Sequence, residues 1–116
     1  MAGESAPPIR GTDLDGAPAE LIPGPGRTVV LFMTSTCRSC RPVWESFATH
    51  PDVVVVTPDP ATENRRKLRR LAGDRRRVIM SSAAWLDYVT GPAPWTVIVE
   101  DGTVVGNGVL RDGPWS

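Results

Sequence analysis

Apolar residues along this chain gather in short runs, which are separated by segments rich in glycine, proline and charged residues. Three of the runs are continuous and aliphatic, as is typical of strands buried on both faces of a sheet. They lie at 28–33, 53–56 and 78–80. Two further runs, at 96–99 and 103–105, flank Glu100-Asp101-Gly102, whose turn-forming residues predict a hairpin.

Between these runs the apolar spacing becomes helical. A stripe with the spacing i, i+3, i+4, i+7 and i+8 starts at Cys40 and predicts a helix with Pro42 in its first turn. Its members are Cys40, Val43, Trp44, Phe47 and Ala48. A second helix is expected to open at Asp59-Pro60 and to stop at Gly73. Its inner face would comprise Ala61, Asn64, Leu68, Leu71 and Ala72. Ser81-Ser82 can cap a brief third helix.

The pattern of apolar and polar residues is different in the N-terminal part, residues 1–22. Residues 1–8 are expected to form a flexible lead-in, because they offer little to bury. Strands at 9–12 and 19–22 would pair as a hairpin around Asp15-Gly16. Strands that alternate with helices and finish in a hairpin predict an α/β fold, with a central mixed sheet flanked by helices. We assign this domain to residues 9–110 and a tail without helical pattern to 111–116.

Composition fits one globular domain, because 116 residues with 41% hydrophobic and 22% charged residues suffice for a single core. The 13 cationic and 13 anionic residues cancel, so no overall field favours nucleic acid. No run approaches the roughly 20 apolar residues that span a bilayer. Most of the cations crowd into 65–77, where a solvated helix face is the simplest interpretation. A docking surface for a partner or for anionic lipid headgroups is the alternative.

The candidate chemistry lies in Cys37-Arg38-Ser39-Cys40, between an expected strand and an expected helix. Backbone N–H groups at a helix start favour the thiolate of Cys37, which is the nucleophile in disulfide exchange. Cys40, one turn later, can attack a mixed disulfide and release the partner. Arg38 adds a cation beside the site, and we expect it to lower the Cys37 pKa and make the disulfide more oxidising.

Other uses of two cysteines fit less well. A structural zinc site needs four ligands, whereas this chain offers two thiols and a histidine, His50, roughly 15 Å farther along the helix. Haem attachment needs a histidine after the second cysteine, where Arg41 stands. If the two thiols were only small buried residues of the core, they would not need to lie at a strand–helix junction. We therefore expect no metal and no organic cofactor, with the cysteine pair itself as the redox centre.

These features resemble the thioredoxin superfamily, and most closely its membrane-tethered branch of TlpA, ResA and MauD type. The resemblance covers about residues 9–108. It is carried by VVLFMTSTCRSC and VIMSSAAWLDYVTGPAPWTVIVEDGTVVGNG. It implies a thioredoxin-like fold in which Pro94 follows a cis bond and Ala93 offers its backbone to a substrate segment, with Pro92 the competing proline.

The resemblance also has departures. Thr36 stands where thioredoxin has tryptophan, and we include it among the substrate-binding residues. Leu31 stands where thioredoxin has a buried acid, so the proton acceptor for Cys40 is not identified. Trp95 is either a platform for the substrate or a core residue. The closing helix of the family is missing after Val109, and an open sheet face there would invite dimerisation or weaken stability, so we expect a monomer or a weak dimer.

The implied function is that of a thiol–disulfide oxidoreductase acting on protein substrates, with an upstream redox donor or acceptor as second partner. The resemblance implies an extracytoplasmic location if an N-terminal anchor was removed, and a cytoplasmic one otherwise. A non-catalytic module that binds or matures a partner enzyme, as MauD does, is one alternative. A redoxin-type peroxidase is another, since Thr34 lies three positions before Cys37.

Overall fold

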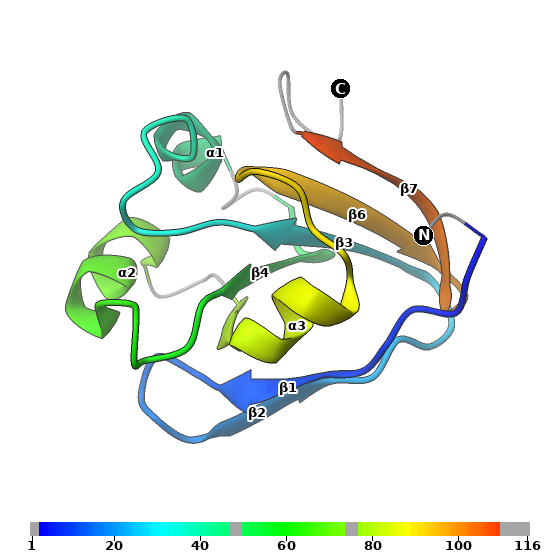
Figure 1. The fold of residues 1–116 in the computed structure, drawn as a ribbon, viewed down its shortest axis with the longest axis horizontal. Helices are drawn as coiled ribbons and strands as arrows, with labels where there is room; N and C mark the ends of the chain where they lie inside the picture. The colour runs from blue at the N-terminus through cyan, green and yellow to red at the C-terminus, as the bar shows by residue number, and fades with distance from the viewer. Residues whose placement is uncertain (1–2, 47–49, 74–76, 110–116) are drawn as a thin grey trace.

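The computed structural model describes residues 3–46, 50–73 and 77–109, which fold around a seven-stranded sheet (Figure 1). The elements are, in chain order, β1 (Ile9–Thr12), β2 (Pro18–Leu21), β3 (Arg27–Phe32), α1 (Arg41–Ser46), β4 (Val53–Thr57), α2 (Arg65–Ala72), β5 (Arg77–Met80), α3 (Ser82–Asp87), β6 (Trp95–Glu100) and β7 (Thr103–Val109). The expected strands, the N-terminal hairpin and the α/β class are thus confirmed.

The sheet is mixed, and its strand order is β2-β1-β5-β4-β3-β6-β7. Strands β3, β4 and β5 run parallel, whereas β1 and β6 join this group antiparallel. Because β6 runs opposite to β3, its first residue, Trp95, pairs with the last residue of β3, Phe32. The segments that follow β3 and precede β6 therefore meet at one edge of the sheet.

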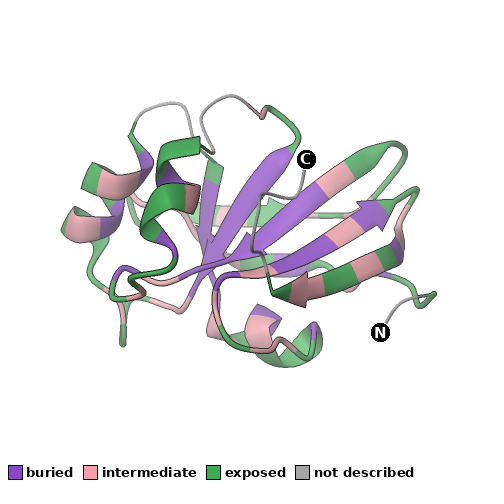
Figure 2. Ribbon diagram, turned by 90° about the horizontal axis from the view of Figure 1, so that it is seen from above, coloured by how far each residue is buried: buried purple, intermediate pink, exposed green. Residues whose placement is uncertain are grey.

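Each face of the sheet carries its own apolar layer. The strand residues alternate between the faces, so Val29 and Leu31 face α1 and α2, while Val30 and Phe32 lie in the layer that includes Ala84 of α3. Figure 2 shows the buried residues concentrated in the central strands, with helices on both sides. The runs in β3 and β4 are continuous because both of their faces are covered.

The start of the second helix differs from the expectation. Asp59 accepts hydrogen bonds from Thr62 N and Glu63 N at 3.1 Å, and these bonds form a separate turn. Helix α2 begins at Arg65, where the side chain of Asn64 caps it by accepting from Lys67 N at 3.0 Å. Ala61 is accordingly exposed rather than part of the inner face. The predicted stop at Gly73 is confirmed, with a φ of 70°.

Most of the cationic side chains of α2 are exposed, in agreement with a solvated face. Arg69 is also exposed, but it makes specific contacts, since it donates to Asp15 and to the carbonyl of Leu14 in the turn between β1 and β2. Arg75 and Arg76 of the same cluster lie outside the described residues, as do Phe47, Ala48 and the tail 111–116.

The lead-in, expected to be flexible, is bonded to the domain in its described part, residues 3–8. Gly3 N donates to Val104 O and Val104 N donates to Glu4 O, so this segment pairs along β7. The hydroxyl of Tyr88 donates to the carbonyl of Pro7 at 2.5 Å. Burial, with a smaller contribution from the charge of Asp87, raises the pKa of Tyr88 to about 12.

Within the described ranges, the structure contains no helix that is long and apolar enough to cross a membrane.

Candidate active site

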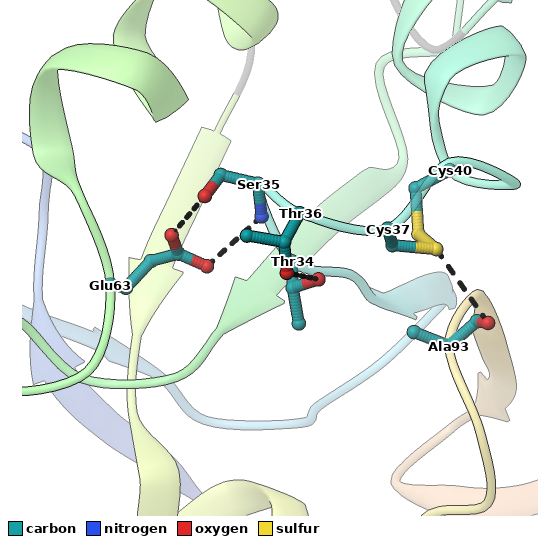
Figure 3. The surroundings of a disulfide bond; sticks show 7 residues. All are labelled: Thr34, Ser35, Thr36, Cys37, Cys40, Glu63 and Ala93. Atoms are coloured by element: carbon teal, nitrogen blue, oxygen red, sulfur yellow. Dashed lines mark hydrogen bonds between the residues drawn. A yellow bond between two sulfur atoms is a disulfide. The ribbon is translucent and has the colours of Figure 1, made fainter.

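The two cysteines lie in the connection between β3 and α1, and they form a disulfide (Figure 3). Their Cα atoms are 5.3 Å apart. Cys40 N donates to Cys37 O at 3.3 Å, which closes a turn before the helix. Trp44 N then donates to Cys40 O at 2.9 Å, so the second cysteine leads directly into α1. The strand–loop–helix position expected from the sequence is confirmed.

The two members of the pair differ in exposure. Cys40 is fully buried in the apolar layer below α1, together with Trp44 and Met33. Cys37 is half-buried and packs at the margin of the same layer. A macromolecule that approaches the disulfide therefore reaches Cys37 first.

The loop before β6 lies against the disulfide. The Sγ atom of Cys37 is 3.7 Å from the carbonyl oxygen of Ala93 (Figure 3). The peptide bond between Ala93 and Pro94 is cis. Pro94 is buried, whereas Pro92, the competing proline, is exposed. The structure thus brings Cys37 and Ala93 together across 56 residues of sequence.

Thr36 and Arg38 flank Cys37 and are both exposed. The hydroxyl groups of Thr34 and Thr36 lie 3.4 Å apart, within hydrogen-bonding distance of one another. The carbonyl of Arg38 accepts from Arg41 N at 3.2 Å, which fixes the backbone of Arg38 at the start of α1. The exposed residues that flank Cys37 in the chain are therefore one with a hydroxyl group and one with a cation.

Trp95 begins β6 directly after Pro94. It is partly buried and packs against the layer that contains Phe32. Its ring also covers Gly91, because a Cβ atom on that glycine would come within 3.0 Å of three ring atoms. The ring thus packs in part against the core, and its role as a platform for the substrate stays a prediction.

Glu63 is a residue near this loop that sequence reasoning did not identify. Its Oε2 atom accepts from Ser35 N at 3.0 Å, and its Oε1 atom accepts from the Ser35 hydroxyl. Ser35 is itself buried, two positions before Cys37. The partners are 28 residues apart, so no local spacing could have indicated the contact. The one signal in the sequence is an acid placed just before a helix whose charged residues are all cationic.

The described part of the chain contains no group of three or more histidine, cysteine, aspartate or glutamate side chains that could hold a metal ion.

No protein-family model matches the chain, and none of the curated proteins matches it in sequence. Solved structures match its fold. The thioredoxin domain of a thiol-disulfide oxidoreductase from Bacteroides vulgatus has a TM-score of 0.71 at 20% identity, over 97% of this chain and 91% of that chain. A thiol:disulfide interchange protein from Bacteroides sp. has a TM-score of 0.64 at 21% identity, over 92% and 80%. A peroxiredoxin-like protein from Aquifex aeolicus has a TM-score of 0.70 at 14% identity, over 95% and 76%.

At these identities the similarity concerns the fold. The chain has a thioredoxin-like α/β fold, with a mixed seven-stranded sheet in its described part. The Cys37–Cys40 disulfide follows β3, an interior strand of that sheet between β4 and β6.

Proposed function

We propose that the protein is a thiol–disulfide oxidoreductase, which exchanges its Cys37–Cys40 disulfide with dithiols or disulfides of other proteins. The observation that carries this proposal is the unequal burial of a bonded pair, with Cys37 accessible and Cys40 enclosed. Exchange needs this asymmetry, because one sulfur must meet the substrate while the other is kept for the intramolecular step.

In the reducing direction the thiolate of Cys37 attacks one sulfur of a substrate disulfide. The substrate S–S bond breaks, a mixed disulfide forms with Cys37, and the other substrate sulfur leaves as a thiolate. The thiolate of Cys40 then attacks Cys37 Sγ, which closes the Cys37–Cys40 bond and releases the second substrate thiol. Two electrons and two protons pass to the substrate, and the same steps reversed oxidise a substrate dithiol.

The neighbouring residues take supporting roles in this proposal. The backbone of Ala93, with Pro94 after it, would pair with an extended substrate segment beside Cys37. Thr36 would contact the substrate from the exposed rim, and Arg38 would stabilise the Cys37 thiolate. Trp95, which is only partly buried, would offer the accessible part of its side chain as a platform for the substrate.

A disulfide-bonded test protein such as insulin, with dithiothreitol as electron donor, tests the proposal. Wild type should accelerate reduction, and Cys37→Ser should abolish the acceleration. Cys40→Ser should instead accumulate a mixed disulfide with the substrate, visible by mass spectrometry, because the resolving thiol is lost. Equal rates of substrate reduction with wild type and with Cys37→Ser would refute the proposal.

The same variants distinguish the alternatives. A binding or maturation module of MauD type would support its partner enzyme even as a Cys37→Ser, Cys40→Ser double variant. A peroxidase would consume hydrogen peroxide with thiol turnover. The Thr34 hydroxyl is within hydrogen-bonding distance of that of Thr36, and Cys37 is bonded to Cys40 as a resolving partner, so we prefer exchange with protein thiols.

We base the proposed cellular location and redox partner on the resemblance to the TlpA, ResA and MauD branch. There the domain would work at the extracytoplasmic face of a membrane, held by an anchor outside this sequence, and would receive or deliver electrons through an upstream redox protein. A cytoplasmic domain would act in the same way without the anchor. Labelling of Cys37 in intact cells by a membrane-impermeant maleimide would support the first location, and labelling only after lysis the second.

A further inference from the structure

The carboxylate of Glu63 lies between the loop that carries Cys37 and the start of α2 (Figure 3). On the loop side it accepts from both donors of Ser35, the backbone N–H at 3.0 Å and the hydroxyl. Ser35 is only 7% exposed and Glu63 is half-buried, so these bonds are partly shielded from water. Hydrogen bonds to a charged acceptor in such surroundings are stronger than neutral ones.

On the helix side, Glu63 Oε1 also accepts from Asn64 N at 2.9 Å. Asn64 is the residue that caps α2, and α2 is held to the sheet by the buried side chains of Leu68 and Ala72. A single carboxylate therefore connects the Cys37 loop to an element that is anchored in the core.

This arrangement requires a carboxylate. Three donors, two from Ser35 and one from Asn64, point at the two oxygens of Glu63. A glutamine of the same shape has one acceptor oxygen and one NH₂ donor. In Glu63→Gln at least one of the three donors would therefore face another donor, while the volume of the side chain would hardly change.

We infer that Glu63 is a positioning residue for the redox step, which holds the Ser35–Cys37 segment so that Cys37 meets Cys40 in bonding geometry. This inference rests on the proposed function. Fixing one thiol relative to the other raises its effective concentration for ring closure. Loss of the Glu63 contacts should therefore make the Cys37–Cys40 disulfide harder to form and easier to reduce.

Equilibration with glutathione measures this directly. The protein dithiol and oxidised glutathione give the protein disulfide and two reduced glutathione molecules, and maleimide labelling counts the remaining protein thiols. We expect Glu63→Gln to lower the equilibrium constant for disulfide formation on the order of tenfold, which corresponds to about 30 mV toward a more oxidising pair. Ser35→Ala, which removes only the hydroxyl donor, should shift it about threefold in the same direction.

Glu100→Gln is the matched control, because it makes the same chemical change at an exposed residue at the far end of β6, and it should leave the constant unchanged. Circular dichroism shows whether each variant folds. If Glu63→Gln does not fold, the equilibrium constant of Ser35→Ala tests the inference instead. Folded variants that lose stability but keep the wild-type constant within twofold would overturn the inference and leave the proposed function intact. A wild-type pair that fails to equilibrate at all would overturn both.

Discussion

The Sγ atom of Cys37 lies 3.7 Å from the carbonyl oxygen of Ala93, although 56 residues separate them in sequence. The contact arises because β6 runs antiparallel to β3, so the loop before one strand meets the loop after the other. In the reduced protein this carbonyl could accept a hydrogen bond from the Cys37 thiol. Arg38 stands next to Cys37 in the chain, and we expect its cation to favour the thiolate.

Arg38→Ala should therefore raise the pKa of the Cys37 thiol and lower its thiolate fraction at neutral pH. Arg38 is exposed, and pairs between exposed charges contribute less than about 1 kcal/mol, so we expect a decrease of about two- to fivefold. A titration of thiolate absorbance in the reduced protein measures the change. Arg27→Ala, at the opposite end of β3, is the control, and equal titrations of all three proteins would exclude a role for Arg38.

The unequal burial of the pair leads to a second prediction. In the reduced protein, iodoacetamide should modify Cys37 more than about tenfold faster than Cys40, because the fully buried Cys40 reacts only when the structure opens locally. Peptide mapping by mass spectrometry after short exposures assigns the site. Denatured protein should lose the selectivity, and equal rates in the folded protein would contradict the proposed division of roles.

The position of the cysteine loop was predictable because its signals are local. The aliphatic run of β3 and the apolar stripe of α1 each define one element, and the loop lies between them. The start of α2 was not predictable in this way, because Asp59-Pro60 suits a turn as well as a helix cap. The bonds of Thr62 N and Glu63 N to the Asp59 carbonyl close that turn, and it places Glu63 where it meets Ser35, a contact that depends on the tertiary fold.

The contacts of the N-terminal segment were likewise not predictable from local signals. Its small and polar residues predict nothing to bury, yet Ala6 is buried and residues 3–6 bond to β7 and the turn before it. The free edge of β7 provides that partner, and no pattern within residues 3–8 indicates it. Trp95 is similar, since the position of its ring depends on the absence of a side chain at Gly91.

Tyr88 should make the stability of the fold sensitive to alkaline pH. Its pKa is raised from 10.0 to about 12 in the folded protein, so folding favours the protonated form. This stabilisation is fully present below pH 10 and is lost between pH 10 and about 12, to a total of about 2 to 3 kcal/mol. Tyr88 is the one tyrosine of the sequence, so tyrosinate absorbance reports it alone. The midpoint should lie near 12 in the native protein and near 10 in urea.

Tyr88→Phe is the control for that titration. The variant loses the hydrogen bond to Pro7, so it should be less stable at neutral pH by about 1 kcal/mol. Between pH 10 and 12, however, its stability should decline less than that of wild type. Parallel declines in the two proteins would show that another group is responsible.

Val89 follows the C-terminal cap of α3 and has a backbone conformation that favours glycine. Val89 N donates to Leu86 O and Thr90 N donates to Trp85 O, which together form a Schellman motif. The residue after the cap, Val89, has a φ of 50°, where a β-branched side chain is strained. Its side chain is 74% exposed, so little packing would be lost on its removal.

Val89→Gly should therefore stabilise the protein, by about 0.5 to 1 kcal/mol, since the relief of strain exceeds the entropy that glycine adds to the unfolded chain. Urea unfolding of the oxidised protein measures the difference. The matched control is Val105→Gly, the same change at a 49% exposed valine in the strand β7, which should destabilise by about 1 kcal/mol. Destabilisation by both substitutions would mean that the exposed Val89 side chain contributes more packing than its strained backbone costs.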